Sequence, residues 1–138
     1  MSKPETKYDL TGQVIGCAMV VHRKLSHGFN ENVYKNSLAI ELRKKGFGCV
    51  VEKKIKVFYK GFVVGDFSAD IVVNDVLIIE LKAVTNLLPA HEAQLVNYLT
   101  ATDSEEGLLL NFGAPSLQYK KKFKDFKPKS TEPPILQS

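Results

Sequence analysis

Three charged side chains, Asp70, Glu80 and Lys82, stand at the ends of two apolar runs in the stretch "DIVVNDVLIIELKAV", residues 70–84. Asp70 opens one apolar run, the chain turns near Asn74-Asp75, and a second run ends in Glu80-Leu81-Lys82. Burying charge is costly unless the charge is paired or coordinates a metal. Charged residues at the ends of two apparent strands therefore indicate an ion pair or a metal site.

Two carboxylates together with a main-chain carbonyl, for which Leu81 is the natural donor, are oxygen ligands of the kind that Mg²⁺ or Mn²⁺ takes. An ion bound there would lower the pKa of a water and neutralise charge on a phosphate. Lys82 could orient or deprotonate that water, or stabilise the charge on phosphorus. An isolated Glu-x-Lys tripeptide is more often a surface ion pair. Other features of the chain are therefore needed to distinguish an ion pair from a metal site.

The turn determines whether Asp70 can join the other two residues. Glu80 and Lys82 share a face because side chains alternate along a strand. A two-residue loop, 74–75, would point Asp70 away from Glu80, whereas a three-residue loop, 74–76, or a bulge would set the two opposite each other. We favour the longer loop or a bulge, because otherwise Asp70 is a charge with no evident role.

The hydrophobic pattern predicts one α/β domain. Helices are predicted at residues 10–25, 30–45 and 89–102, and strands at 49–59, 62–73, 76–84, 107–112 and 117–123. With 138 residues, the chain is long enough for one domain with a sizeable core. We expect that domain at residues 8–124, followed by a flexible C-terminal tail at 125–138.

Two of the predicted helices carry polar residues beside their apolar stripes. Glu31 and Tyr34 are three apart on the second helix, and Gln94 and Tyr98 are four apart on the third, with His91 one turn before Gln94. Residues with these spacings share a helix face. Taken singly, each is more often a capping or surface residue than part of a site.

The net charge of +4 is concentrated near the C-terminus. Residues 120–129 contain six lysines and one aspartate, which gives that segment a charge of +5 and the remainder −1. Aromatic residues (Tyr119, Phe123 and Phe126) alternate with the lysines. Such a segment can bind phosphates or can simply be a solvated end, and Tyr119 and Phe123 could instead pack beneath an edge strand.

No apolar run is long enough to span a bilayer, and the N-terminus "MSKPETKYDL" lacks the apolar core of a signal peptide. We therefore expect a cytoplasmic protein with no membrane partner. Cys17 and Cys49 have no CxxC spacing and are expected to be small core residues.

The series Asp70, Glu80-x-Lys82 and Gln94-x-x-x-Tyr98 resembles the PD-(D/E)XK nuclease superfamily, especially its RecB-type exonuclease branch. "GFNENVY", residues 28–34, matches the pattern that names the GxxExxY family of that superfamily. "ELKAV" followed by "PAHEAQLVNYL" resembles the same family. The resemblance covers about residues 10 to 123.

This resemblance implies a restriction-endonuclease-like core, in which helices flank a central mixed β-sheet. It implies Asp70 and Glu80 as metal ligands, Lys82 as the catalytic lysine, Glu31 as a further acidic residue at the metal, and Gln94 and Tyr98 as residues that line the site and touch the substrate. The chain has Ala69 where proline is common before the aspartate, and it lacks the cysteine cluster of the iron–sulfur exonucleases, so no such cluster is expected.

The expected function is a Mg²⁺- or Mn²⁺-dependent nuclease that hydrolyses phosphodiester bonds in nucleic acid, with DNA as the favoured substrate. One alternative is a catalytically silent nucleic-acid-binding or accessory module of the same fold. Another is a homodimeric, structure-selective endonuclease. A domain of this size has little surface for gripping DNA alone, which makes a homodimer or a partner subunit a reasonable expectation.

Overall fold

The elements follow the order that the sequence predicts, in a computed structural model that describes residues 7–124. The helices are α1 (Lys7–Leu25), α2 (Glu31–Lys44) and α3 (Pro89–Thr100), and the strands are β1 (Cys49–Tyr59), β2 (Phe62–Val73), β3 (Leu77–Lys82), β4 (Glu106–Asn111) and β5 (Gln118–Phe123). Every bound lies within two residues of the predicted one, except that α1 begins three residues earlier. The tail predicted at 125–138 lies outside the described residues, so its flexibility and the domain limits stay predictions.

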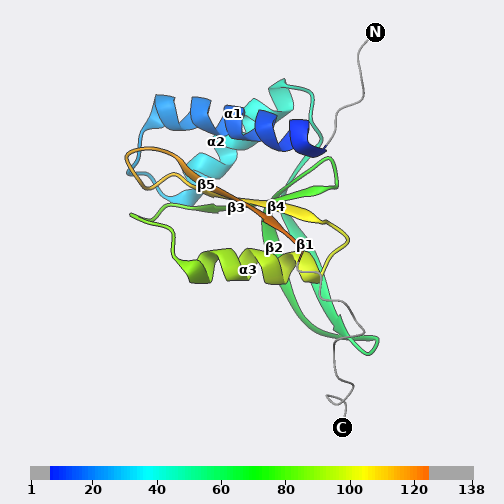
Figure 1. Ribbon diagram of the computed structural model, residues 1–138. Helices are drawn as coiled ribbons and strands as arrows, with labels where there is room; N and C mark the ends of the chain where they lie inside the picture. Colours follow the sequence, from blue (N-terminus) through cyan, green and yellow to red (C-terminus); the bar gives the residue numbers. More distant parts are fainter. Residues whose placement is uncertain (1–6, 125–138) are drawn as a thin grey trace.

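The sheet has the strand order β1-β2-β3-β4-β5. The β3–β4 pair is parallel and the other pairs are antiparallel. A parallel pair needs a crossover, and α3 supplies it. Figure 1 shows α1 and α2 on one face of the sheet and α3 on the other, which confirms the predicted mixed sheet flanked by helices.

Strand β3 lies at the centre of the molecule with both of its faces covered. Ile79 packs with the cluster beneath α1 and α2, which includes Tyr34 and Leu38. Ile78 packs with the cluster beneath α3, which includes Leu95. Burial on both sides explains why β3 reads as a continuous apolar run. By alternation, the side chain of the next even-numbered residue in the strand, Glu80, belongs to the α3 side.

The β2–β3 hairpin has the three-residue loop that the sequence analysis favoured. Val73 pairs with Leu77, and the Val76 N–H donates to the Val73 carbonyl at 3.0 Å. Asn74 and Asp75 both take left-handed conformations, with φ of 51° and 59°. Asn and Asp tolerate this region better than most residues, so the loop chemistry sets the register of the hairpin.

Strand β2 changes its packing at Asp70. Ala69 packs with the α3-side cluster, but Ile71 packs with the cluster of α1 and α2. Residues two apart would share a face in a regular strand. On β1, the pairs Val51–Ile71 and Lys53–Ala69 flank this point, and the residue between them has a positive φ. Asp70 therefore sits where the hairpin twists away from the core.

A polar network holds the segment that follows β3. The Asn111 amide accepts the Val84 N–H at 2.9 Å and donates to the Val84 carbonyl at 2.8 Å. The Phe112 N–H donates to the Lys82 carbonyl at 2.9 Å. Gly113 packs so tightly here that a Cβ would lie 2.4 Å from backbone atoms of Val84. The end of β3 is thereby fixed against β4.

The basic edge strand β5 is anchored from the α3 side. Lys122 pairs with Glu92 of α3 at 2.9 Å, and the Lys124 ammonium donates to the Thr102 carbonyl at 2.6 Å. Tyr119 and Phe123 are exposed, so they do not pack beneath the strand.

None of the helices within residues 7–124 is long and apolar enough to cross a membrane. Both cysteines are free; Cys17 is buried and Cys49 half-buried, close to the core positions expected for them. The cytoplasmic location stays a prediction.

Candidate active site

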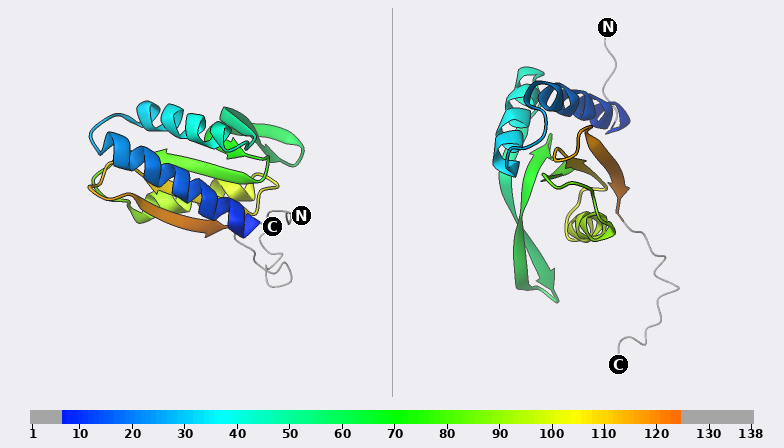
Figure 2. Two further views of the ribbon diagram at one scale, coloured as in Figure 1. Left: turned by 90° about the horizontal axis from the view of Figure 1, so that it is seen from above. Right: turned by 90° about the vertical axis from the view of Figure 1, so that its left-hand side faces the viewer.

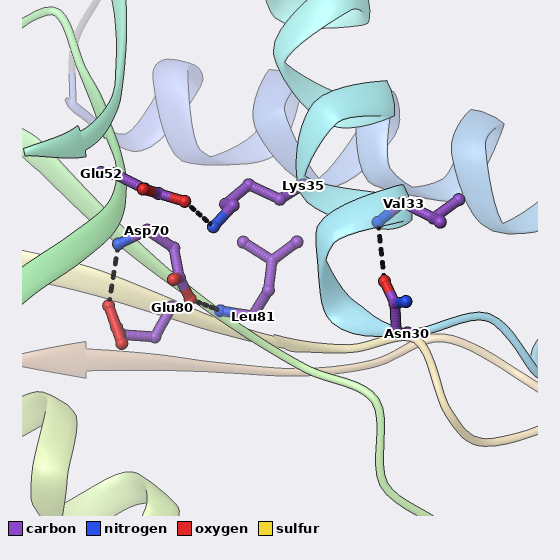
Figure 3. A network of polar contacts seen from close by, with 7 residues as sticks. All are labelled: Asn30, Val33, Lys35, Glu52, Asp70, Glu80 and Leu81. Carbon is purple, nitrogen blue, oxygen red and sulfur yellow. Dashed lines mark hydrogen bonds and ion pairs between the residues drawn. The ribbon is translucent and has the colours of Figure 1, made fainter.

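Asp70 and Glu80 face each other across β2 and β3. The Asp70 N–H donates to Glu80 Oε1 at 3.1 Å, and the Leu81 N–H donates to Asp70 Oδ2 at 2.7 Å (Figure 3). Each carboxylate is therefore fixed by the main chain of the opposite strand. Within residues 7–124, Asp70 Oδ1 and Glu80 Oε2 take part in no hydrogen bond, which leaves one oxygen of each carboxylate available for a ligand.

Burial and mutual repulsion act on this pair. Glu80 is only 7% exposed. Burial, and next the negative charge of Asp70, raise the pKa of Glu80 to about 8. Burial also raises the pKa of Asp70, against the opposing effect of the Leu81 amide. Like charges held together at a buried position favour either a shared proton or a bound cation.

Lys82 follows Glu80 by two residues and is half-buried at the end of β3. Its positive charge lowers the pKa of both Asp70 and Glu80. The structure thus brings together the three residues with which the sequence analysis began. The Leu81 side chain points into the core beneath α1 and α2, while its amide meets Asp70.

The motif residues of "GFNENVY" form the turn that begins α2. Gly28 has a φ of 122°, which a residue with a side chain rarely adopts. The Tyr34 hydroxyl donates to the Ser26 carbonyl at 2.5 Å and accepts the Phe29 N–H at 3.2 Å. Tyr34 is fully buried and stacks on Phe112, with ring centroids 4.7 Å apart. The turn itself therefore explains Gly28 and Tyr34, the glycine and the tyrosine of the GxxExxY pattern.

Glu31, the glutamate of the GxxExxY pattern, occupies the first turn of α2. Asn30 caps this helix, because its Oδ1 accepts the Val33 N–H at 3.3 Å. Glu31 is exposed, and its negative charge is the weakest of the effects that raise the pKa of Glu80. Its charge thus reaches Glu80, but in the described part of the chain no contact joins Glu31 to either carboxylate.

The residues predicted on α3 are placed unequally. Tyr98 stacks on Phe67 with ring centroids 3.7 Å apart, and burial and then the charges of Glu80 and Asp70 raise its pKa. Gln94 is exposed one turn earlier on the same helix, and no hydrogen bond within residues 7–124 links it to the carboxylates. His91 accepts the Leu88 N–H at 3.1 Å, as a residue that closes the start of a helix does.

Sequence reasoning missed one ion pair beside the carboxylates. Lys35 is 7% exposed, and its ammonium lies 2.6 Å from Glu52 Oε2 (Figure 3). Lys35 also lowers the pKa of Asp70. One signal was present, because Lys35 is four residues after Glu31 and so shares its helix face. The left-handed φ of 55° at Glu52 cannot be read from a strand pattern.

The donor set fits a hard divalent cation. Asp70 and Glu80 each offer an oxygen, and a cation would relieve their repulsion. No group of three or more metal-binding side chains gathers anywhere in residues 7–124. Mg²⁺ commonly binds through one or two carboxylates and keeps several waters, so two protein carboxylates are sufficient for this kind of site.

Comparisons with known proteins identify a family and several similar folds. The family model for the PD-(D/E)XK nuclease superfamily matches residues 8–124. The solved structure of SSO0001 has a TM-score of 0.54 and 14% identity, over 88% of this chain and 80% of that one. A search of curated proteins found no significant match.

Two structures of the alkaline exonuclease LHK-Exo from Laribacter hongkongensis are also similar. The first has a TM-score of 0.50 and 12% identity, over 89% of this chain and 73% of that one. The second, in complex with dAMP, has a TM-score of 0.52 and 13% identity, over 80% of this chain and 69% of that one. At these identities the likeness shows the fold alone.

The match over residues 8–124 places the chain in a class of enzymes that cut nucleic acid. The chain belongs to the PD-(D/E)XK nuclease superfamily, whose members generally use divalent metals.

Proposed function

We propose that this protein is a divalent-metal-dependent nuclease that hydrolyses phosphodiester bonds in DNA at a centre made by Asp70, Glu80 and Lys82. The observation that carries the proposal is the opposition of two buried carboxylates, each fixed by a backbone amide of the other strand. This arrangement raises the pKa of Glu80 to about 8, so keeping Glu80 charged costs free energy unless a bound cation compensates.

Asp70 and Glu80 would hold Mg²⁺ or Mn²⁺, with the Leu81 carbonyl and Glu31 as further ligands, directly or through water. The bound cation would neutralise charge on the phosphodiester and lower the pKa of a water. Lys82 orients or deprotonates the attacking water, or stabilises the negative charge that develops on phosphorus. Tyr98 and Gln94 line the path of the substrate backbone.

DNA is the proposed substrate, and the GxxExxY family is the proposed branch of the superfamily. The dAMP complex of LHK-Exo, a deoxynucleotide bound by a protein of similar fold, supports DNA over RNA. The turn built from Gly28 and Tyr34, with Glu31 in the first turn of α2, supports the branch.

The test is a cleavage panel of single-stranded, duplex and branched DNA and of RNA, each with Mg²⁺ and with Mn²⁺. We expect the wild type to cut at least one DNA substrate and Glu80→Gln to cut none. Asp75→Asn, which changes an exposed carboxylate in the loop between β2 and β3, is the matched control and should cut normally. A wild type that binds metal and nucleic acid but cuts no substrate would instead identify a catalytically silent binding module.

A further inference from the structure

The β1–β2 hairpin continues as a two-stranded arm, residues 54–66, past the part of the sheet that the helices cover. Figure 2 shows it projecting beyond α3. Five of its large apolar side chains are each more than half exposed, and Phe62 is 75% exposed. These side chains are Phe58, Tyr59, Phe62, Val63 and Val64. Such a concentration of exposed apolar residues marks an interaction surface.

Both faces of the arm are apolar near its tip. Tyr59 pairs with Phe62 and Phe58 with Val63, and residues paired directly share a face. Adjacent residues of one strand point to opposite faces, so the two pairs lie on opposite sides. The arm therefore offers aromatic rings to a ligand that passes on either side.

The same arm is basic. Lys54 and Lys56 are exposed on β1, and Lys60 at the turn lies over the Tyr59 ring, with its ammonium 5.4 Å from the centroid. Asp66 is the acidic residue of the arm. Rings alternating with lysines suit a chain of unpaired bases on a phosphate backbone, because bases stack on aromatic rings and phosphates attract ammonium groups.

A groove of about 580 Å³ runs between the arm and α3. Val57, Phe58, Gly65 and Tyr98 are among the residues that line it. Tyr98 also feels the charges of Asp70 and Glu80. Phe67, on which Tyr98 stacks, also lines the groove and precedes Asp70 by three residues on β2, so the groove lies along the strand that carries one of the two carboxylates.

We propose that the arm binds single-stranded nucleic acid and guides it along this groove to the Asp70–Glu80 pair. The direction toward the pair rests on the proposed nuclease function; the binding surface does not. A second copy of the chain is a less suitable occupant. β1 is an edge strand, and lysines on an edge strand oppose pairing with another strand, whereas the same lysines attract phosphate.

The experiment measures fluorescence anisotropy of a labelled oligodeoxythymidine with the full chain in EDTA, where no cleavage occurs. We expect the double variant Tyr59→Ser/Phe62→Ser to weaken binding by about tenfold or more, since each stacked base contributes about 1–3 kcal/mol. Ile40→Ser, which removes an exposed apolar side chain from α2, is the matched control and should bind as the wild type does. The arm tip lies outside the core, so thermal melting should be unchanged.

Salt dependence tests the lysines separately. Replacing Lys54, Lys56 and Lys60 by Ala should make the slope of log affinity against log salt shallower by about 2. Wild-type affinity in the aromatic variant, or no binding by the wild type, would overturn the inference. So would a wild-type dimer that the aromatic variant dissociates without loss of oligonucleotide affinity. None of these binding results changes the outcome expected in the cleavage panel. If the wild type cuts no substrate in that panel, the proposal that the arm binds nucleic acid is unaffected.

Discussion

At the scale of single residues, opposing effects act on Asp70 and Glu80. Each carboxylate accepts a backbone N–H from the opposite strand, which favours its charged form. Burial favours the neutral form of both carboxylates, and the charge of Asp70 adds to this effect at Glu80. Together these effects outweigh the hydrogen bonds, so the pKa of each carboxyl group is raised. Lys82 and Lys35 offset only part of that penalty for Asp70. A divalent cation would complete the compensation.

Metal affinity should depend on the charge of Asp70. We expect Asp70→Asn to weaken Mn²⁺ binding by about tenfold or more, because an amide oxygen offers a hard cation no net charge. Isothermal titration calorimetry measures the effect, with Asp75→Asn, a change at an exposed carboxylate of the β2–β3 loop, as the control. Equal Mn²⁺ affinity in the wild type and Asp70→Asn would show that the metal binds elsewhere.

The raised pKa of Glu80 should make the metal-free protein less stable as pH rises. Its ordinary value is 4.5, and the folded state raises it to about 8. Between these values the folded protein keeps a proton that the unfolded chain has lost. The stabilisation that this proton provides is fully present below pH 4.5 and is lost as pH rises through 8.

Urea denaturation in EDTA between pH 5 and pH 8 measures this dependence. We expect the free energy of unfolding to fall by a few kcal/mol over that range, given about 1.4 kcal/mol per pKa unit. Glu80→Gln should flatten the curve, because glutamine does not titrate. A wild-type stability that is constant or rises over this range would contradict the raised pKa.

At the scale of elements, the site depends on how β3 is terminated. The Asn111 amide binds both backbone groups of Val84, and Gly113 allows the β4 end to approach within contact of that segment. Lys82 lies just before this junction, with its carbonyl bonded to Phe112. The position of the lysine thus follows from packing outside the site.

Gly113→Ala should destabilise the fold by about 2 kcal/mol or more, because the new methyl group meets backbone atoms 2.4 Å away, which cannot move as a side chain does. Gly16→Ala is the matched control. It adds a methyl group to α1 where nothing lies within 4 Å, and it should stabilise the fold by about 0.5–1 kcal/mol. Thermal or urea unfolding compares the two variants, and equal stability would mean that the contact relaxes without penalty.

The sequence predicted most of the secondary structure and the length of the β2–β3 loop. Periodicity and turn residues predicted all of the elements in residues 7–124 in their order, and the charge of Asp70 selected the three-residue loop. The twist at Asp70 and the Lys35–Glu52 pair could not be predicted, because they depend on a positive φ in the middle of a strand. The exposure of Phe62 was also hidden, since an apolar strand reads as buried until its neighbours in the sheet are known.

At the scale of the whole molecule, the sheet order separates two basic regions. β1, with the lysines of the arm, forms one edge of the sheet, and β5 forms the other. On β5, Lys122 is bound to Glu92, and just beyond the strand Lys124 is bound to Thr102, so part of that charge is used to anchor the strand. The arm carries Lys54, Lys56 and Lys60 on or next to β1, and Tyr98 lines the groove between the arm and α3.

In the proposed nuclease, Lys82, beside the Asp70–Glu80 pair, performs the chemistry. The most direct test is the rate of DNA cleavage by Lys82→Ala in Mn²⁺, compared with the wild type and with Lys44→Ala, which removes an exposed lysine at the end of α2. We expect a loss of about a hundredfold or more for Lys82→Ala, the range of a positioned acid–base group, with unchanged Mn²⁺ affinity and unchanged cleavage by Lys44→Ala. Cleavage by Lys82→Ala at the wild-type rate would show that Lys82 is not the catalytic lysine.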